Sequence, residues 1–351
     1  MKSLPLPVQW ILLIVLSLLL GTALLLYHLP AALLMGPMLV AVTMGLGGAT
    51  VRVSPKIFIG CQAVLGCMIA LMLSPSILGI LLSYWWLVIV VVMMTLLASG
   101  LSGFLLVKFS HLPGPTGAWG SSPGGASAMV AMSGEFGADV RLVAFMQYLR
   151  VLFVAAAAAI VAHRYMGGQN GAAAPIDWFP TLNLRFVATL VIAAAGAWLG
   201  RKLRIPAGAL LVPMIIGAVL HITGTLTLLV PEWLLALAYA FIGWSVGLRF
   251  TPTIVSLAFK TLPQMVASII GLILLCGVMA WLLTLMLPVD MLTAYLATSP
   301  GGLDTVAIIA AGSHADIGFV MALQSLRLLS ILVLGPGIAR FISRNAHARM
   351  T

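Results

Sequence analysis

Long apolar stretches separated by short polar breaks run from one end of the chain to the other. As helices, stretches of this length can cross a hydrocarbon core of about 30 Å. The pattern therefore predicts an all-α polytopic membrane protein with about ten spans. The expected spans cover residues 7–27, 30–48, 54–73, 83–109, 139–164, 182–201, 206–224, 230–249, 262–287 and 316–342.

Two further apolar segments, 115–135 and 292–312, are interrupted by the same four residues. Ser122-Pro123-Gly124-Gly125 breaks the first segment, and Ser299-Pro300-Gly301-Gly302 breaks the second. Proline lacks an amide donor and glycine allows unusual φ angles, so each break ends helical pairing. Inside a bilayer, such backbone must be buried in protein or line a polar cavity. We expect a short helix after each break, capped by Ser122 or Ser299 and with the proline at its first position.

The two breaks lie 177 residues apart, and other residues repeat at the same distance. With no gap, this offset pairs Asp139 with Asp316, Gln147 with Gln324, and Arg150 with Arg327. Upstream, the stretch LPAALLMGPML resembles IPAGALLVPMI at an offset of 176. The chain therefore divides into two copies of one unit. The copies cover residues 1–165 and 182–345, joined by a Gly/Ala-rich linker at 166–181 and followed by a tail at 346–351.

Basic residues indicate whether the two copies are parallel or inverted, because cytoplasmic loops carry an excess of Lys and Arg. If each broken segment enters and leaves the membrane on one side, each copy has five spans and the second copy is inverted. Thirteen basic residues then face the cytoplasm and two face outside, whereas parallel six-span copies would give nine and six. We therefore predict two inverted five-span repeats, each with a re-entrant segment, and both termini in the cytoplasm.

The composition is typical of a membrane protein and limits the classes of partner that the protein can bind. The chain is 62% hydrophobic and 7% charged, with a mean hydropathy of +1.20, whereas soluble domains carry about 25% charged residues. The net charge of +10 fits basic cytoplasmic loops, and no polar segment is long enough for a DNA-binding domain. The expected partners are the bilayer and a small solute, without direct nucleic-acid contact, and a homodimer stays an open alternative.

Little in the sequence indicates a metal site or a disulfide bond. Cys61, Cys67 and Cys276 sit in apolar surroundings without a CxxC pair, and the six His residues are scattered. We therefore expect no catalytic residue, no metal site and no cofactor.

The two breaks are the first candidate for a binding site. Free N–H groups and the positive dipole end of the short helix after each break would favour an anion. In inverted repeats these ends would meet near the midplane, where secondary transporters bind solute. The alternative is that Pro-Gly-Gly only allows two helices to pack closely. Asp139 and Asp316, at the starts of the last spans, are expected to cap those helices.

Arg150 and Arg327 are the second candidate, each about twelve residues into a span and one helical turn after Gln147 or Gln324. A charged residue at that depth costs at least ~2.5 kcal/mol and usually faces a cavity or a partner. The two arginines could bind a carboxylate or other anion, or they could tie the repeats together through an acidic side chain or helix-end carbonyls. Asp304, two residues beyond the second Gly-Gly, is a candidate coupling group for H⁺ or Na⁺, or a partner for either arginine.

Three stretches, TGAWGSSPGGASAMVAM, GADVRLVAFMQYLRVLFVA and AYLATSPGGLDTVAIIAAGS, resemble the AbrB family of bacterial membrane proteins, whose members carry an internal duplication. The resemblance covers nearly the whole chain and implies an antiporter- or symporter-like fold in the bacterial inner membrane. Family members are described as regulators of gene expression and, in older naming, as ammonia monooxygenases. The small soluble DNA-binding AbrB regulators share only the name. The chain offers neither the clustered metal ligands of a monooxygenase nor a soluble DNA reader.

Three classes of function remain. We expect a secondary transporter of a small, anionic solute that works by alternating access around the two broken segments. The alternative is a membrane-embedded sensor that binds a ligand and affects gene expression indirectly. Its weakness is that the cytoplasmic loops and residues 343–351 look too short for an output surface. An enzyme is the least favoured of the three.

Overall fold

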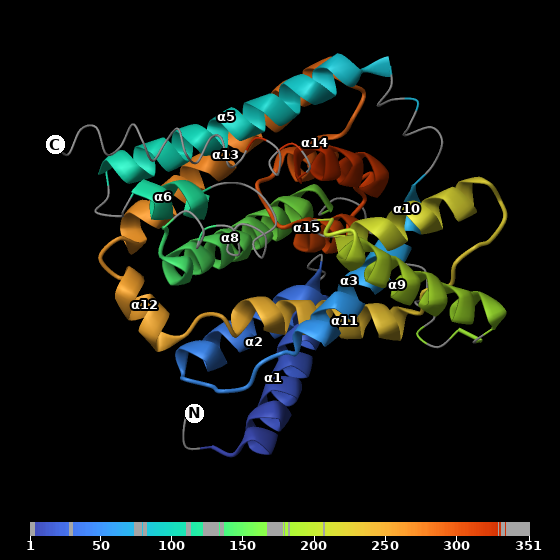
Figure 1. The fold of residues 1–351 in the computed structure, drawn as a ribbon, viewed down its shortest axis with the longest axis horizontal. Coiled ribbons are helices and arrows are strands. Elements are labelled where there is room, and N and C mark those ends of the chain that lie inside the picture. Colours follow the sequence, from blue (N-terminus) through green and yellow to red (C-terminus); the bar gives the residue numbers. More distant parts are fainter. Residues whose placement is uncertain are drawn as a thin grey trace.

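The computed structural model describes residues 4–27, 31–73, 79, 83–109, 114–121, 133, 137–166, 178, 180–181, 183–205, 208–328, 330 and 334. All regular secondary structure in this part of the chain is helical (Figure 1). The helices of the first half are α1 (Leu6–Leu26), α2 (Ala32–Leu46), α3 (Pro55–Met72), α5 (Trp85–Phe109), α6 (Gly114–Ser121) and α8 (Val140–Met166). Those of the second half are α9 (Leu184–Lys202), α10 (Gly208–Ile222), α11 (Glu232–Gly247), α12 (Pro252–Ala258), α13 (Leu262–Met286), α14 (Met291–Thr298) and α15 (Leu303–Ala311), followed by the helix Ile317–Leu328.

Five of the described helices, α1, α5, α8, α9 and α13, are long and apolar enough to cross a membrane. Five shorter apolar helices accompany them: α2, α3, α10, α11 and Ile317–Leu328. The long helices turn large apolar side chains outward, such as Leu18, Leu97 and Leu285, which are 63%, 67% and 66% exposed. Such a surface suits acyl chains rather than water. The predicted all-α class is therefore confirmed within the described residues, and five of the expected spans are helices long and apolar enough to cross a membrane.

Helices of the two halves begin at matching positions. α3 and α11 begin 177 residues apart, as do α5 and α13, and α6 and α14. Side-chain hydrogen bonds recur in the same way. The hydroxyl of Thr116 accepts from the backbone N–H of Asp139 at 3.0 Å, and that of Thr293 accepts from the N–H of Asp316 at 2.9 Å. Local structure thus repeats where the sequence repeats.

The two halves pack together through two corresponding and very close helix contacts. α3 packs on α10, where a Cβ built on Gly66 would lie 2.3 Å from the carbonyl oxygen of Leu210. α11 packs on α2, where a Cβ built on Gly243 would lie 2.8 Å from the carbonyl oxygen of Leu34. Gly66 pairs with Gly243 at the offset of 177, and Leu34 with Leu210 at 176. Backbones this close need glycine at the contact.

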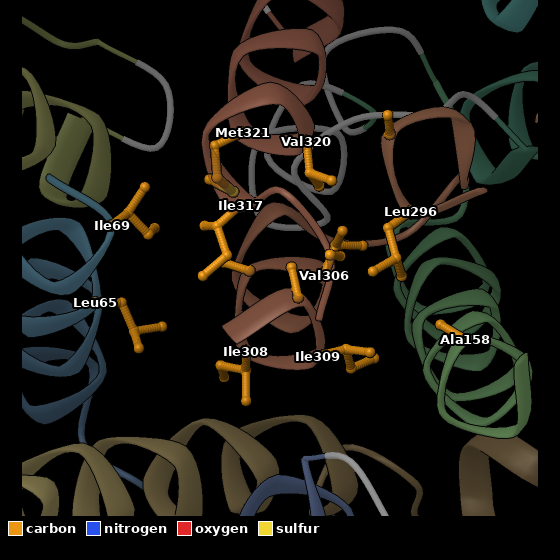
Figure 2. Packing of buried hydrophobic residues seen from close by; sticks show 14 of the residues in the cluster. Leu65, Ile69, Ala158, Leu296, Val306, Ile308, Ile309, Ile317, Val320 and Met321 are labelled. Carbon is orange, nitrogen blue, oxygen red and sulfur yellow. The ribbon is translucent and has the colours of Figure 1, made fainter. Parts of the chain in front are cut away.

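The packing places the broken segment of the second half at the centre of the molecule. In Figure 1, α5 and α13 run side by side along one edge, and α2 and α11 lie on the opposite side, next to α1. α8, α14 and α15 lie between them. Figure 2 shows the apolar shell around this centre, with Leu65 and Ile69 of α3 on one side and Ala158 of α8 on the other. The shell keeps the polar side chains at the centre in an apolar surrounding.

Candidate functional site

The second Ser-Pro-Gly-Gly motif separates α14 from α15. Ser299 follows the last residue of α14, and Gly302, with φ −73° and ψ 142°, is the N-cap of α15. The Ser299 hydroxyl donates to the carbonyl oxygen of Leu296 at 3.0 Å. The expected N-cap role of Ser299, with Pro300 as the first helical residue, is therefore wrong. The chain stays extended through Gly302, so α15 starts only at Leu303, and the hydroxyl reaches back to α14 instead.

Some of the predicted residues are not covered by the described part of the chain. The first motif, Ser122 to Gly125, lies outside the described residues, and of Asp304 only the backbone, within α15, is described. Residues 346–351 and most of the 166–181 linker also lie outside.

Thr293 joins the two ends of the second broken segment. Its hydroxyl donates to Asp290, whose carboxylate caps α14, and accepts from the backbone N–H of Asp316 at 2.9 Å. Asp290 precedes the segment and Asp316 follows it, so the segment begins and ends at neighbouring points. The sequence analysis missed Thr293, although the offset of 177 that pairs it with Thr116 could have found it.

Asp139 and Asp316 cap their helices, as predicted. The Asp139 carboxylate accepts from the backbone N–H of Arg141 at 2.9 Å, and the Asp316 carboxylate accepts from the N–H of Phe319 at 3.0 Å. Both carboxylates satisfy amide donors that have no partner within the helix, and both lie at its positive end.

Replacing Thr293 with valine is expected to lower the free energy of unfolding by about 1 kcal/mol, because valine keeps the shape of threonine but leaves the Asp316 N–H without its acceptor. Denaturant titration in mixed micelles measures the change. Thr284→Val is the control, since the Thr284 hydroxyl donates to the Trp281 carbonyl within its own helix. Equal losses in the two variants would mean that the link between the segment ends contributes no special stability.

Arg327 and Gln324 hold the backbone of the second break. One guanidinium nitrogen of Arg327, Nη1, donates to the carbonyl oxygen of Ser299, and Nη2 donates to that of Gly301 at 3.1 Å. Gln324 Nε2 donates to the carbonyl oxygens of Leu296 and Ser299, at 2.7 and 3.1 Å. Arg327 therefore ties the helix-end carbonyls of its own half, and these bonds are not the tie between the two repeats that was open from the sequence.

Arg150 and Gln147 make corresponding contacts in the first half. Gln147 Nε2 donates to the carbonyl oxygen of Trp119 at 3.0 Å, which matches the Gln324 contact with Leu296 at an offset of 177. Arg150 Nη1 donates to the carbonyl oxygen of Ser121 at 3.3 Å, and Nη2 donates to Gln147 Oε1 at 2.6 Å. The predicted Gln–Arg pairs thus each bind the C-terminal end of a short helix, α6 or α14.

The two arginines come from different halves of the chain but lie close together. They are 3% and 5% exposed, and Arg150 is near enough to Arg327 for their charges to repel each other. The second break adjoins this place, because a Cβ built on Gly301 would lie 3.1 Å from Val154 Cγ1, one helical turn after Arg150. Like charges are costly to bury together, and an anion between them would relieve the repulsion.

Several buried polar atoms on α14 and on the helix that carries Arg327 have no hydrogen-bond partner among the described residues. They are Gln324 Oε1, Arg327 Nε and Tyr295 Oη. Gln324 and Tyr295 are 0% and 4% exposed, and a buried polar atom without a partner costs about 1–3 kcal/mol. A polar solute at this place would therefore gain hydrogen bonds. Tyr295 was not among the residues expected from the sequence, where nothing distinguishes it from an apolar core residue.

The cysteines and the possible metal ligands indicate little about the chemistry of the site. Cys61, Cys67 and Cys276 are free and buried, as expected from their apolar surroundings. Cys276 lies near both arginines, and its carbonyl oxygen accepts from the hydroxyl of Thr298 at 3.2 Å. Within the described residues, no group of three His, Cys, Asp or Glu side chains is placed to hold a metal ion.

Comparison with known proteins agrees with the resemblance drawn from the motifs. The family model described as "Transition state regulatory protein AbrB" matches residues 33–343. The chain is 53% identical to "Putative regulator AbrB" of Escherichia coli K12 over 343 residues, which cover 97% of this chain and 98% of that protein. It is 28% identical to "Uncharacterized protein YhjN" of Bacillus subtilis 168 over 296 residues, or 80% and 77% of the two chains. No solved structure matches the chain significantly. The match over most of its length shows that the chain belongs to the AbrB family.

Proposed function

We propose that the chain is a secondary transporter that moves a small anionic solute across the bacterial inner membrane. The observation that carries this proposal is the pair of buried arginines, Arg150 and Arg327, which lie close together beside a break between two helices. Burying two like charges costs free energy, and an anion bound beside them would lower this cost. The proposal assigns no catalytic residue, metal or cofactor.

Two inverted repeats would supply the symmetry that alternating access needs, and the helix contacts support them. α2 and α11 run in the same direction, because Gly243 faces Leu34 and Gly247 faces Met38. α3 and α10 also run in the same direction, because Gly66 faces Leu210 and Gly217 faces Ala70. α2 and α3 are consecutive spans joined by a short loop, so they run in opposite directions. α10 would then run opposite to α2, its counterpart in the first half.

The basic residues at the helix ends agree with this orientation. Burial and the nearby charge of Arg249 lower the pKa of Arg52, so the two residues lie close together. Arg52 follows α2 and Arg249 follows α11, and inverted repeats place both on the cytoplasmic side. Parallel repeats would separate them by the thickness of the membrane.

The Thr293 link supports a re-entrant rather than a crossing segment. α14 and α15 have eight and nine residues, so each is about 12–14 Å long and reaches less than halfway across the roughly 30 Å core. The bond from Asp316 to Thr293 brings the end of the segment back to its beginning. The break, with Gly301 and Gly302, would then lie near the midplane. Asp304, on the short helix that leaves the break, is our candidate for the group that couples transport to H⁺ or Na⁺.

A membrane-embedded sensor is the second candidate, and the names of the family and of its E. coli member favour it. Such a protein would bind the same kind of ligand at the arginines and affect gene expression through a partner protein, without moving the ligand. The two candidates therefore share a binding site and differ in flux.

Binding should be tested first, on detergent-purified protein, with small carboxylates, other inorganic and organic anions, amino acids, Na⁺ and pH. An anion that binds the folded state raises the unfolding temperature. We expect such a rise in the wild type and in Arg185→Ala, whose arginine is exposed at the start of α9. Arg150→Ala and Arg327→Ala should not respond.

Flux then separates the two candidate functions. An anion identified by binding should accumulate in proteoliposomes under an H⁺ or Na⁺ gradient if the chain is a transporter. Binding without flux would favour the sensor, and equal responses in all four proteins would contradict an anion site at the arginines.

A further inference from the structure

We propose that the groove between α5 and α13 binds a single-chain amphiphilic carboxylate, with its tail in the groove and its carboxylate at Arg150. The inference rests on the proposed function and names the class of its solute. α5 and α13 lie side by side (Figure 1) and enclose a groove with a volume of about 410 Å³. Small-molecule sites range over roughly 300–1,000 Å³. The volume therefore suits one alkyl chain better than a two-chain phospholipid.

The walls of the groove are apolar and open toward the surface of the protein. Leu101 and Leu105 of α5 and Leu275 of α13 line it, and they are 55%, 42% and 40% exposed. Both helices are apolar enough to span the membrane, so this opening faces acyl chains rather than water. A ligand that enters here must have an apolar part, because a fully polar solute would lose its hydration at the opening.

The floor of the groove is polar and leads toward the buried arginine. The hydroxyls of Ser102 and Ser268 are hydrogen-bonded to each other at 2.6 Å across the two helices. Both serines also line a second, smaller pocket, which ends at Ser121 and Arg150. Ser102 and Ser268 are thus among the described residues that line both the groove and the pocket at Arg150.

The polar groups at the floor match a carboxylate. Arg150 supplies the positive charge, and the two serine hydroxyls can turn to donate once their mutual bond opens. Gln264 also lines the groove, and its Oε1 is buried without a partner among the described residues. A protonated carboxylic acid could donate to this oxygen on entry.

The groove occupies only one end of the helix pair. At the other end, Val91 of α5 and Ala280 and Leu283 of α13 belong to one buried cluster, and they are 7%, 0% and 2% exposed. Lys108, at the open end of α5, lies on the cytoplasmic side by the count of basic residues. The tail would therefore enter from the cytoplasmic half of the bilayer.

The proposal is tested with acetate, decanoate and decanol on purified protein in a maltoside detergent, by the shift of the unfolding temperature and by the Kd obtained from it. Decanoate should bind the wild type at least about tenfold more tightly than acetate, because several methylenes leave water. Decanol has the same tail without the charge and controls for mixing with the micelle, so it should give no comparable shift.

Two matched variants of α13 test the position of the tail. A Cβ built on Gly271 or on Gly277 would meet no atom within 4 Å, so both positions accept a side chain, but only Gly271 lines the groove. Gly271→Trp should weaken decanoate to the level of acetate and leave acetate binding unchanged. Gly277→Trp should bind both as the wild type does, and Arg150→Gln should bind neither.

The outcomes separate this inference from the proposed function. If acetate binds but decanoate binds no better, or if Gly271→Trp binds decanoate normally, the groove is not the tail site, although the anion site stands. If decanol stabilises the protein as well as decanoate does, Arg150 does not recognise the head group. If neither acetate nor decanoate binds to the folded wild type or to folded Gly277→Trp, the groove is not a tail site. The arginines then do not bind a carboxylate either.

Discussion

Replacing Arg327 with methionine is expected to lower the free energy of unfolding by about 3 kcal/mol. Methionine fills a similar volume but cannot donate, so the carbonyl oxygens of Ser299 and Gly301 lose their bonds to the guanidinium group. The Ser299 oxygen keeps its bond from Gln324 Nε2. The Gly301 oxygen is left buried without a donor among the described residues, which costs about 1–3 kcal/mol, and the loss of two hydrogen bonds to a charged group adds to this cost. Relief of the repulsion with Arg150 returns part of this cost. Denaturant titration in mixed micelles measures the net change.

Lysine at the same position distinguishes charge from geometry. Arg327→Lys keeps the positive charge but cannot donate two divergent hydrogen bonds from a planar group. We expect it to recover less than half of the stability lost in Arg327→Met. Arg185→Met, on the exposed start of α9, should lose less than about 0.5 kcal/mol. If Arg327→Met were as stable as the wild type, the guanidinium would not be what holds the break.

Replacing Gly66 with valine is expected to destabilise the protein by about 3 kcal/mol or to prevent its folding. The first added carbon would lie 2.3 Å from the carbonyl oxygen of Leu210, which belongs to the backbone of α10 and cannot swing away. The helices must then move apart, and overpacking of this kind usually costs about 1–3 kcal/mol, occasionally more. Gly243→Val should behave similarly, because the corresponding contact with Leu34 is 2.8 Å.

Gly60 provides a control within α3. A Cβ at this position would meet no atom within 4 Å, and alanine favours a helix over glycine by roughly 0.5–1 kcal/mol. Gly60→Ala should therefore unfold at the same or a higher denaturant concentration than the wild type. A destabilised Gly60→Ala together with a stable Gly66→Val would contradict the close packing of α3 on α10.

The sequence predicted the all-α class and the long apolar helices well, because apolar length does not depend on tertiary detail, whereas the inverted repeat stays a prediction. It also singled out Arg150 and Arg327, since a charge deep in a span stands out against its surroundings, and their role in binding a solute stays a prediction. The predicted N-cap at Ser299 was wrong because the sequence allows a helix to start at Pro300 or at Leu303. The backbone is extended through Gly302, so α15 starts at Leu303. Thr293 and Tyr295 were missed because their roles depend on partners brought near by the fold, which leave no local pattern.

The reciprocal contacts of Gly66 with Leu210 and of Gly243 with Leu34 have a consequence for how the chain can be divided. Each half presents a bare glycine face that only the other half covers, so neither half is a complete folding unit. Two separate chains, residues 1–165 and 182–345, should therefore be degraded when each is produced alone. Produced together, they should recover a stable complex, because the surfaces that hold the intact protein together are surfaces between its halves.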